Sequence, residues 1–214
     1  MSDSDDDDLQ LCPTTLAALK EFLQEKEERE NQLQCFSENQ TLNVSFDENW
    51  QLSQFWYDEN TTDTLVNGAI HSTQSDGKIA LISCPTLYNK LKKSCGERQV
   101  TLFEYDERFK AFGSDYVPYN YKFPLDLPKD KENYYDLVIA DPPFLSEECL
   151  TKTALTIKFL AKKNIVLCTG AVMAECAEKL LNVKICNFVP HHQNNLANEF
   201  YCYSNFDFDK MLNK

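Results

Sequence analysis

An acid, two prolines and an aromatic ring follow one another at Asp141-Pro142-Pro143-Phe144. They come directly after the aliphatic run 135–140, which is typical of a short buried strand. The prolines cannot donate to a sheet ladder, so the strand must end before them. The fixed backbone would let the Asp141 carboxylate and the Pro142 carbonyl accept hydrogen bonds from one amine, with the Phe144 ring over a planar base or a cation. The alternative is a plain turn that ends a strand with a capping acid.

Two more strand ends carry residues that could contact a cofactor. The run 78–83 leads into the sequence SCPT at 83–86, where nucleotide-binding α/β domains usually have glycines. No G-x-G-x-x-G occurs in the chain, which gives a phosphate-binding loop little support but leaves a cofactor without phosphates open. The run 99–106 ends in Asp106, which is placed to accept hydrogen bonds from ribose hydroxyls. Acids commonly follow strands, so Asp106 alone does not decide between a ligand role and a solvated turn.

These strand ends need a framework that brings them together. Short aliphatic runs predict strands at 78–83, 99–106, 115–119, 135–140, 164–169, 183–190 and 199–206. Helical patterns lie between most of them, at 61–72, 85–96, 146–163 and 171–182. Alternating strands and helices predict an α/β fold with a doubly wound parallel sheet. The polar connector 190–198 predicts that the last two strands form an antiparallel hairpin at the sheet edge.

The acidity of the chain is concentrated at its beginning. The 214 residues carry a formal net charge of −13, and residues 1–48 hold 13 acidic and only 3 basic side chains. The remainder is nearly neutral and lacks the basic surface that nucleic-acid binding usually needs. We expect a disordered acidic tail at 1–12, an N-terminal helix and linker at 13–48, and one folded domain at 49–214.

The composition also indicates in which cell compartment the protein acts and whether it binds a metal ion. No apolar run is long enough to span a bilayer and the chain opens MSDSDDDDLQ, so we expect a soluble, unsecreted protein with no membrane partner. Nine scattered cysteines without a C-x-x-C pair fit a reducing compartment, and we expect the cytoplasm. His191 and His192 lack the ligand spacing of a zinc site, so we expect no metal.

The sequence at 141–144 resembles the [Asp/Asn/Ser]-Pro-Pro-aromatic signature of class I S-adenosylmethionine-dependent methyltransferases that modify nitrogen atoms. A wider set of segments is similar to the eukaryotic elongation factor 1-alpha lysine methyltransferase family, whose members were once labelled adenine DNA methyltransferases. These segments are ENWQLSQFWY at 48–57, CPT at 84–86, FEYDERF at 103–109, PLDLP at 124–128, DLVIADPPFLSEECL at 136–150, LCTGAVM at 167–173 and NLANEF at 195–200. The resemblance covers about residues 46–206, and the helical sequence TLAALKEF at 15–22 extends it.

The resemblance implies a Rossmann-like, seven-stranded class I methyltransferase sheet that is mostly parallel, with an antiparallel edge hairpin and an N-terminal helix. It also implies S-adenosylmethionine as the cofactor and a lysine of elongation factor 1-alpha as the substrate. Carried over by position, it gives three sets of cofactor contacts: Ser83, Cys84 and Pro85 for the methionine end, Asp106 for the ribose, and Asn120 near the adenine. Asn120 stands where the family tends to have an acid, and Phe144 where it often has a tyrosine.

Two further segments have open interpretations. Gln54-Phe55-Trp56-Tyr57 could close over the cofactor or form an aromatic plug between the N-terminal helix and the sheet. We favour the plug for Phe55 and carry Trp56 and Tyr57 as candidate cofactor contacts. The polar sequence 194–198 is a candidate site for recognition of a protein substrate, although such a loop is often only solvated.

Three functions remain to be compared. A protein-lysine methyltransferase fits best, acting as a monomer on a folded basic protein without stable nucleic-acid binding. An adenine-specific DNA or RNA methyltransferase would need room for a flipped base and a surface to hold the strand, for which this chain has little sequence. A non-enzymatic binding module is conceivable because the first loop lacks glycine.

Overall fold

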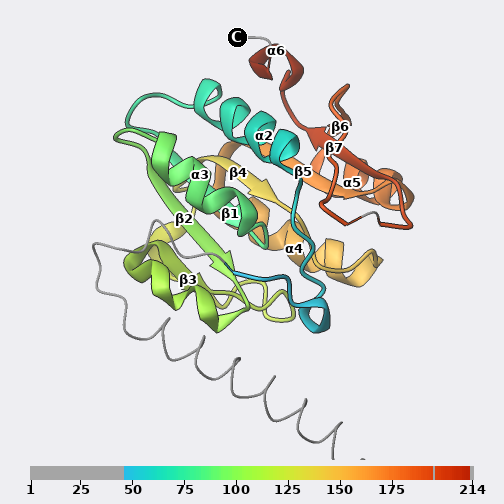
Figure 1. The fold of residues 1–214 in the computed structure, drawn as a ribbon, viewed down its shortest axis with the longest axis horizontal. Coiled ribbons are helices and arrows are strands. Elements are labelled where there is room, and N and C mark those ends of the chain that lie inside the picture. Colours follow the sequence, from blue (N-terminus) through green and yellow to red (C-terminus); the bar gives the residue numbers. More distant parts are fainter. Residues whose placement is uncertain (1–45, 195, 213–214) are drawn as a thin grey trace, which may run out of the picture.

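A seven-stranded sheet forms the middle layer of the computed structural model, which describes residues 46–194 and 196–212 (Figure 1). The strand order is β3-β2-β1-β4-β5-β7-β6. The predicted acidic tail at 1–12 lies outside the described residues, as does the predicted N-terminal helix and linker up to residue 45. The alternating strands and helices predicted from residue 61 onward are confirmed.

The first five strands run parallel to one another, and β7 runs antiparallel to both of its neighbours. The strands are β1 (Lys78–Ile82), β2 (Gln99–Glu104), β3 (Tyr116–Pro118), β4 (Tyr135–Ala140), β5 (Ala161–Gly170), β6 (Lys184–Ile185) and β7 (Phe200–Ser204). The predicted antiparallel edge hairpin is thus confirmed. The edge strand β6 is shorter than the predicted run 183–190, because Asn187 N–H turns to the Asp209 carboxylate instead of continuing the ladder.

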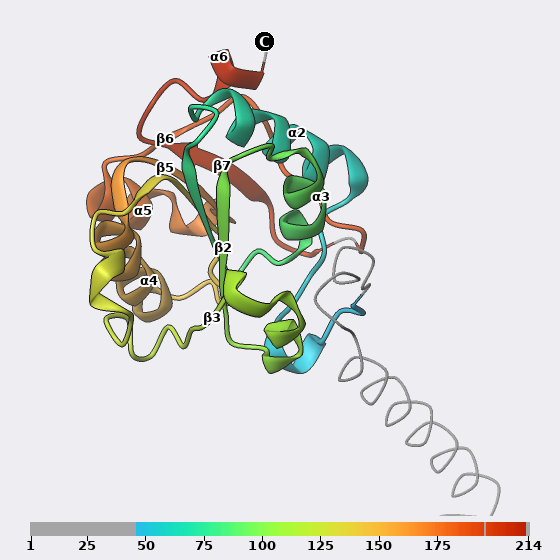
Figure 2. The ribbon, with the colours of Figure 1, turned by 90° about the vertical axis from the view of Figure 1, so that its left-hand side faces the viewer.

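Helices cover both faces of the sheet (Figure 2). The helices α2 (Glu59–His71) and α3 (Thr86–Ser94) pack on one face, and α4 (Glu147–Leu160) and α5 (Ala174–Leu181) on the other. The short helix α6 (Asp209–Leu212) packs against α2. Ser146 caps α4 as predicted, since its hydroxyl accepts a hydrogen bond from Cys149 N–H at 3.2 Å. Short 3₁₀ helices complete the described chain: η2 (Trp50–Leu52), η3 (Glu107–Asp115), η4 (Lys129–Lys131) and η5 (Ala171–Met173).

The register of the central strands brings three polar positions to one edge of the sheet. β1 pairs with both β2 and β4, and their carboxyl ends finish at the same level. Ser83 follows β1, Glu104 ends β2 and Asp141 follows β4. The carboxyl edge of a doubly wound sheet is where such folds bind ligands. The fold therefore creates its candidate site here.

Three features are not found among the described residues. No helix in this part of the chain is long and apolar enough to cross a membrane. No group of three or more His, Cys, Asp or Glu side chains in it is arranged to hold a metal ion. The seven described cysteines are all free thiols.

Candidate active site

A cavity of about 360 Å³ opens at the carboxyl edge of β1, β2 and β4. Its walls come from four strand-end loops, from residues 51–57 and from the loop between β6 and β7. All predicted site residues except Asp106 line it. They are Trp56, Tyr57, Ser83, Cys84, Pro85, Asn120, Asp141, Pro142, Pro143 and Phe144. The volume suits a small organic cofactor.

Asp141 is held in place by a buried tyrosine. The Tyr57 hydroxyl donates a hydrogen bond to Oδ2 of Asp141 at 2.5 Å, and Tyr57 is only 2% exposed. Burial raises the pKa of Asp141 to about 7; the Tyr57 hydrogen bond opposes this rise and the charge of Glu104 adds to it. A carboxyl group that titrates near neutral pH can bind a cation or exchange a proton with it. Asp141 is therefore equipped for chemistry on an amine.

Phe144 lies at the mouth of the cavity, where its side chain is 43% exposed. Its ring meets that of Tyr121 edge to face, with the centroids 5.7 Å apart. An aromatic face beside an acceptor carboxylate offers a cationic amine both a π-system and a counter-charge. The four residues of the motif at 141–144 all line the cavity, and their joint contact with an amine stays a prediction.

The glycine-free first loop has a left-handed residue at its start. Ser83 has φ of 53°, a conformation that glycine adopts more easily. The bend is held by a hydrogen bond from Ser83 N–H to the Phe103 carbonyl at 2.9 Å. The Cys84 thiol points inward, 3.5 Å from the Ile139 carbonyl, and burial raises its pKa well above the ordinary value. Cys84 is therefore a packing residue under the loop rather than a nucleophile.

At the end of β2 the cavity is lined by Glu104 and not by Asp106, the predicted ribose acceptor. Asp106 does not line the cavity: its carboxylate accepts hydrogen bonds from Arg108 N–H and from the Arg108 guanidinium, and it caps η3. Although burial opposes it, these bonds to Arg108 hold the pKa of Asp106 below the usual range. Glu104 is the last residue of β2, is 5% exposed and lines the cavity. Burial raises the pKa of Glu104 to about 7.

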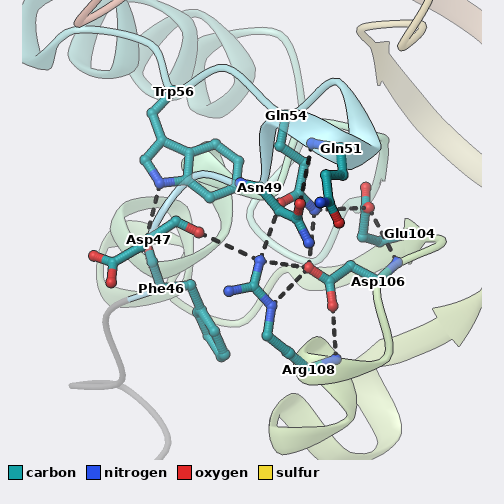
Figure 3. A network of polar contacts seen from close by, with 9 residues as sticks. All are labelled: Phe46, Asp47, Asn49, Gln51, Gln54, Trp56, Glu104, Asp106 and Arg108. Carbon is teal, nitrogen blue, oxygen red and sulfur yellow. Dashed lines mark hydrogen bonds and ion pairs between the residues drawn. The ribbon is translucent and has the colours of Figure 1, made fainter. Parts of the chain in front are cut away.

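Gln54 joins these two carboxylates from the segment before the sheet (Figure 3). Its side-chain amide donates to Glu104 Oε1 at 3.3 Å and to Asp106 Oδ2 at 3.0 Å. Its Oε1 accepts from Arg108 at 3.1 Å and from Asn49 N–H at 3.2 Å. Gln54, Glu104 and Asp106 are each no more than 6% exposed, so the bonds between these three side chains are shielded from water. The residues before the sheet are thus bound to the end of β2.

The same segment is bound to the loop between β6 and β7. The Glu48 carboxylate accepts hydrogen bonds from Trp56 N–H at 2.7 Å, from Trp50 Nε1 at 2.9 Å and from Asn194 Nδ2 at 2.7 Å. A further bond runs from Gln193 N–H to the Trp56 carbonyl at 2.8 Å. Leu196, Ala197 and Asn198 of this loop line the cavity, as a loop over the active face should.

Three consecutive aromatic residues of this segment, Phe55, Trp56 and Tyr57, all line the cavity. Phe55 was expected to plug the space beside the sheet, but it is half-buried and lines the cavity. Trp56 and Tyr57 also line the cavity, and their contact with a cofactor stays a prediction. Trp56 is fixed by a hydrogen bond from its Nε1 to the Phe46 carbonyl at 2.9 Å.

His192 is a cavity residue that the sequence spacing does not reveal. It forms a β-bridge with Tyr57, and its ring lies 5.1 Å from the Tyr57 ring and 4.9 Å from the Phe200 ring, centroid to centroid. Burial lowers the pKa of His192, so the imidazole is neutral near pH 7 and can accept a proton. The contact depends on pairing between segments about 135 residues apart, which no local pattern signals.

The strand order, the antiparallel β7 and the Asp-Pro-Pro-aromatic turn after β4 define a class I S-adenosylmethionine-dependent methyltransferase. A family model described as "Probable N6-adenine methyltransferase" matches residues 48–208, and the chain belongs to that family. The EEF1A lysine methyltransferase 1 of Gallus gallus is 50% identical over 96% of this chain and 98% of the relative. The Mus musculus protein of the same name is 49% identical over 97% of each chain.

The solved structures agree on the fold. A Pyrococcus horikoshii protein solved as a candidate RNA methyltransferase superimposes with a TM-score of 0.50 over 84% of this chain and 94% of its own. Its sequence identity is 11%, so the likeness concerns the fold alone. The predicted Rossmann-like methyltransferase sheet is confirmed.

Proposed function

We propose that this protein transfers a methyl group from S-adenosylmethionine to the ε-amine of a lysine in elongation factor 1-alpha. The observation that carries the proposal is the Asp141 carboxylate, held by Tyr57 inside the cavity and flanked by the half-exposed Phe144 ring. The names of the relatives support the same substrate, since they are EEF1A lysine methyltransferases. The proposal extends to a cytoplasmic enzyme that acts as a monomer without stable nucleic-acid binding.

The cavity walls fit the cofactor at three points. Glu104 offers a buried carboxylate to the ribose hydroxyls, and the Asn120 amide can hydrogen-bond an adenine edge. The residues Ser83–Pro85, Trp56 and Tyr57 line other parts of the wall. When bound, S-adenosylmethionine supplies an electrophilic methyl group on a positively charged sulfur.

The protein must bind the lysine as a cation and then remove one proton. A free lysine amine has a pKa near 10.4, so it arrives protonated, and the ionised Asp141 carboxylate together with Phe144 can hold it. Burial in the cavity lowers the amine pKa. The neutral, half-buried imidazole of His192 can accept the released proton and pass it to solvent. The amine lone pair is then free, while Asp141 and the Pro142 carbonyl orient its remaining hydrogens.

An adenine amine is the second candidate, because the family description names it and the same motif suits it. It would arrive neutral and would not require a proton acceptor before attack. However, residues 49–214 are slightly acidic overall, which does not favour binding of a phosphate backbone. The lysine substrate is therefore preferred.

The test is transfer of a radiolabelled methyl group into purified elongation factor 1-alpha and into nuclease-treated cell lysate. Wild type and Asp141→Ala are compared at equal concentration. We expect a nuclease-resistant labelled protein that the variant does not produce, with the label on lysine after hydrolysis. Label that is lost on nuclease treatment would move the assignment to adenine, and label on neither would refute both.

A further inference from the structure

The loop from Asn120 to Pro128 presents two large apolar side chains to solvent beside the cavity. Tyr121 and Leu127 pack against the core on the α4 side of the sheet. Between them, Phe123 is 64% exposed and Leu125 is 57% exposed. Apolar side chains of this size, side by side on a surface, commonly mark an interaction site. The sequence PLDLP in this loop has no role in the cofactor cavity.

Hydrogen bonds fix this loop in one conformation. Phe123 N–H donates to the Asn120 carbonyl at 2.9 Å, and Asp126 N–H donates to the Phe123 carbonyl at 3.1 Å. The fully buried Thr156 of α4 donates its hydroxyl to the Pro124 carbonyl at 2.8 Å. Phe123 and Leu125 are therefore held outward by a rigid turn, so binding a partner through them costs little ordering entropy.

The exposed pair is continuous with the mouth of the cavity. Asn120, Tyr121 and Lys122 line the cavity, and the Tyr121 ring contacts the half-exposed Phe144 ring. A molecule that inserts a side chain past Phe144 would thus rest its surface on Phe123 and Leu125. The start of α4 is on the same side, because Phe144, whose ring contacts Tyr121, precedes Glu147 by three residues.

Charges at this mouth favour a basic partner over a nucleic acid. Glu147 and Glu148 are exposed in the first turn of α4, where Glu148 pairs with Lys152, and Asp126 is exposed directly after Leu125. Carboxylates attract a surface that carries lysines and repel a phosphate backbone. Lys122 is the exposed cation on this loop, and it lies near Glu148.

We propose that Phe123 and Leu125 form the docking site for the folded protein that carries the target lysine. This inference rests on the proposed function. Phe123 and Leu125 bind an apolar patch beside that lysine, Phe144 and Tyr121 guide the lysine into the cavity, and the carboxylates at the start of α4 meet neighbouring basic groups. The docking site supplies affinity for the folded substrate and contributes nothing to the transfer itself.

The test uses a double variant that carries both Phe123→Ser and Leu125→Ser. This variant is compared with wild type on two substrates. These are folded elongation factor 1-alpha and a short peptide that contains the same lysine. Loss of two anchoring side chains should raise KM for the folded protein about tenfold or more, while kcat and the affinity for S-adenosylmethionine stay within about twofold of wild type. Activity on the peptide, which cannot reach the docking site, should not change.

Ile185→Ser is the matched control, because Ile185 is 58% exposed but lies on β6 at the opposite edge of the sheet. It should leave KM unchanged on both substrates. An unchanged KM of the double variant on the folded protein, or an equal loss on the peptide, would overturn the docking site. If wild type itself does not methylate elongation factor 1-alpha, the proposed function fails, which is a different result.

A photoreactive phenylalanine analogue in place of Phe123, in the full chain, identifies the occupant directly. We expect a cross-link to elongation factor 1-alpha that excess unlabelled substrate suppresses. A cross-link to a second copy of the enzyme, or to residues 1–45 of the same chain, would assign the surface to that occupant and contradict the proposal.

Discussion

The two ends of the cavity are built around two carboxylates with different partners, the buried Glu104 and the half-buried Asp141. At the end of β2, Glu104 accepts hydrogen bonds from Asp106 N–H and from the Gln54 amide. At the end of β4, Asp141 accepts one from the Tyr57 hydroxyl. Burial raises the pKa of each carboxylate to about 7. The two side-chain donors, Gln54 and Tyr57, lie three residues apart in the segment that precedes the sheet.

The difference between these two ends assigns cofactor binding to one end and methyl transfer to the other. Glu104 accepts hydrogen bonds from two neutral N–H donors, which suits recognition of cofactor hydroxyls. Asp141 has Phe144 beside it and is linked through Tyr57 to His192, which suits an amine that must lose a proton. Substitutions at the two ends should therefore affect different kinetic constants.

The largest effect is expected for Asp141→Asn. The carboxamide keeps the shape and the hydrogen bond to Tyr57 but removes the charge that holds an ammonium group. We expect kcat to fall about 1,000-fold while the dissociation constant of S-adenosylmethionine changes less than about threefold. Methyl-transfer kinetics and calorimetry measure the two quantities. Equal losses in both would show that the two ends are not separate.

Glu104→Gln should give the opposite pattern. A neutral amide is a weaker acceptor for ribose hydroxyls than a carboxylate, by about 1.5 kcal/mol, so cofactor affinity should fall about tenfold. At saturating S-adenosylmethionine, kcat should remain within about threefold of wild type. Calorimetry measures the dissociation constant of S-adenosylmethionine. An unchanged constant would show that Glu104 does not contact the cofactor.

Tyr57→Phe tests the link between Asp141 and the pre-sheet segment. The Tyr57 hydrogen bond lowers the pKa of Asp141, so its loss should raise that pKa. Activity needs the ionised carboxylate and is lost as pH falls through its pKa, so the acidic limb of the pH profile should move to higher pH. At pH 7 we expect about a fivefold loss of kcat. Glu104→Gln is the control, because removal of its negative charge should move the limb to lower pH.

The sequence predicted those features that depend on local pattern. Aliphatic runs bounded by breakers located the strands, and the two prolines fixed the end of β4 and hence Asp141 at the carboxyl edge. The end of β2 was placed two residues late, because the acid at Asp106 resembles a strand-end ligand. It is in fact the N-cap of η3, and β2 ends at Glu104.

The residues that the sequence missed depend on contacts between distant segments. Gln54 meets Glu104 across 50 positions, and His192 meets Tyr57 through a β-bridge between the pre-sheet segment and the β6–β7 loop. Gln54 lies in the family-like segment 48–57, but no local pattern signals that its partner is Glu104, and His192 belongs to no motif. Only the folded sheet, which brings its carboxyl edge and both segments together, defines their role.

The smallest effect is expected for Asp106→Asn, which tests the reassignment of the ribose acceptor. Asp106 is 6% exposed and its carboxylate pairs with Arg108, so the variant should lose about 1 kcal/mol of unfolding free energy and a few degrees of melting temperature. Its affinity for S-adenosylmethionine should stay within about twofold of wild type, because Asp106 faces Arg108 and Gln54 rather than the cavity. Thermal unfolding and calorimetry on the same preparation separate the two effects. A tenfold loss of affinity without loss of stability would return the ribose to Asp106 and leave Glu104 as a structural carboxylate.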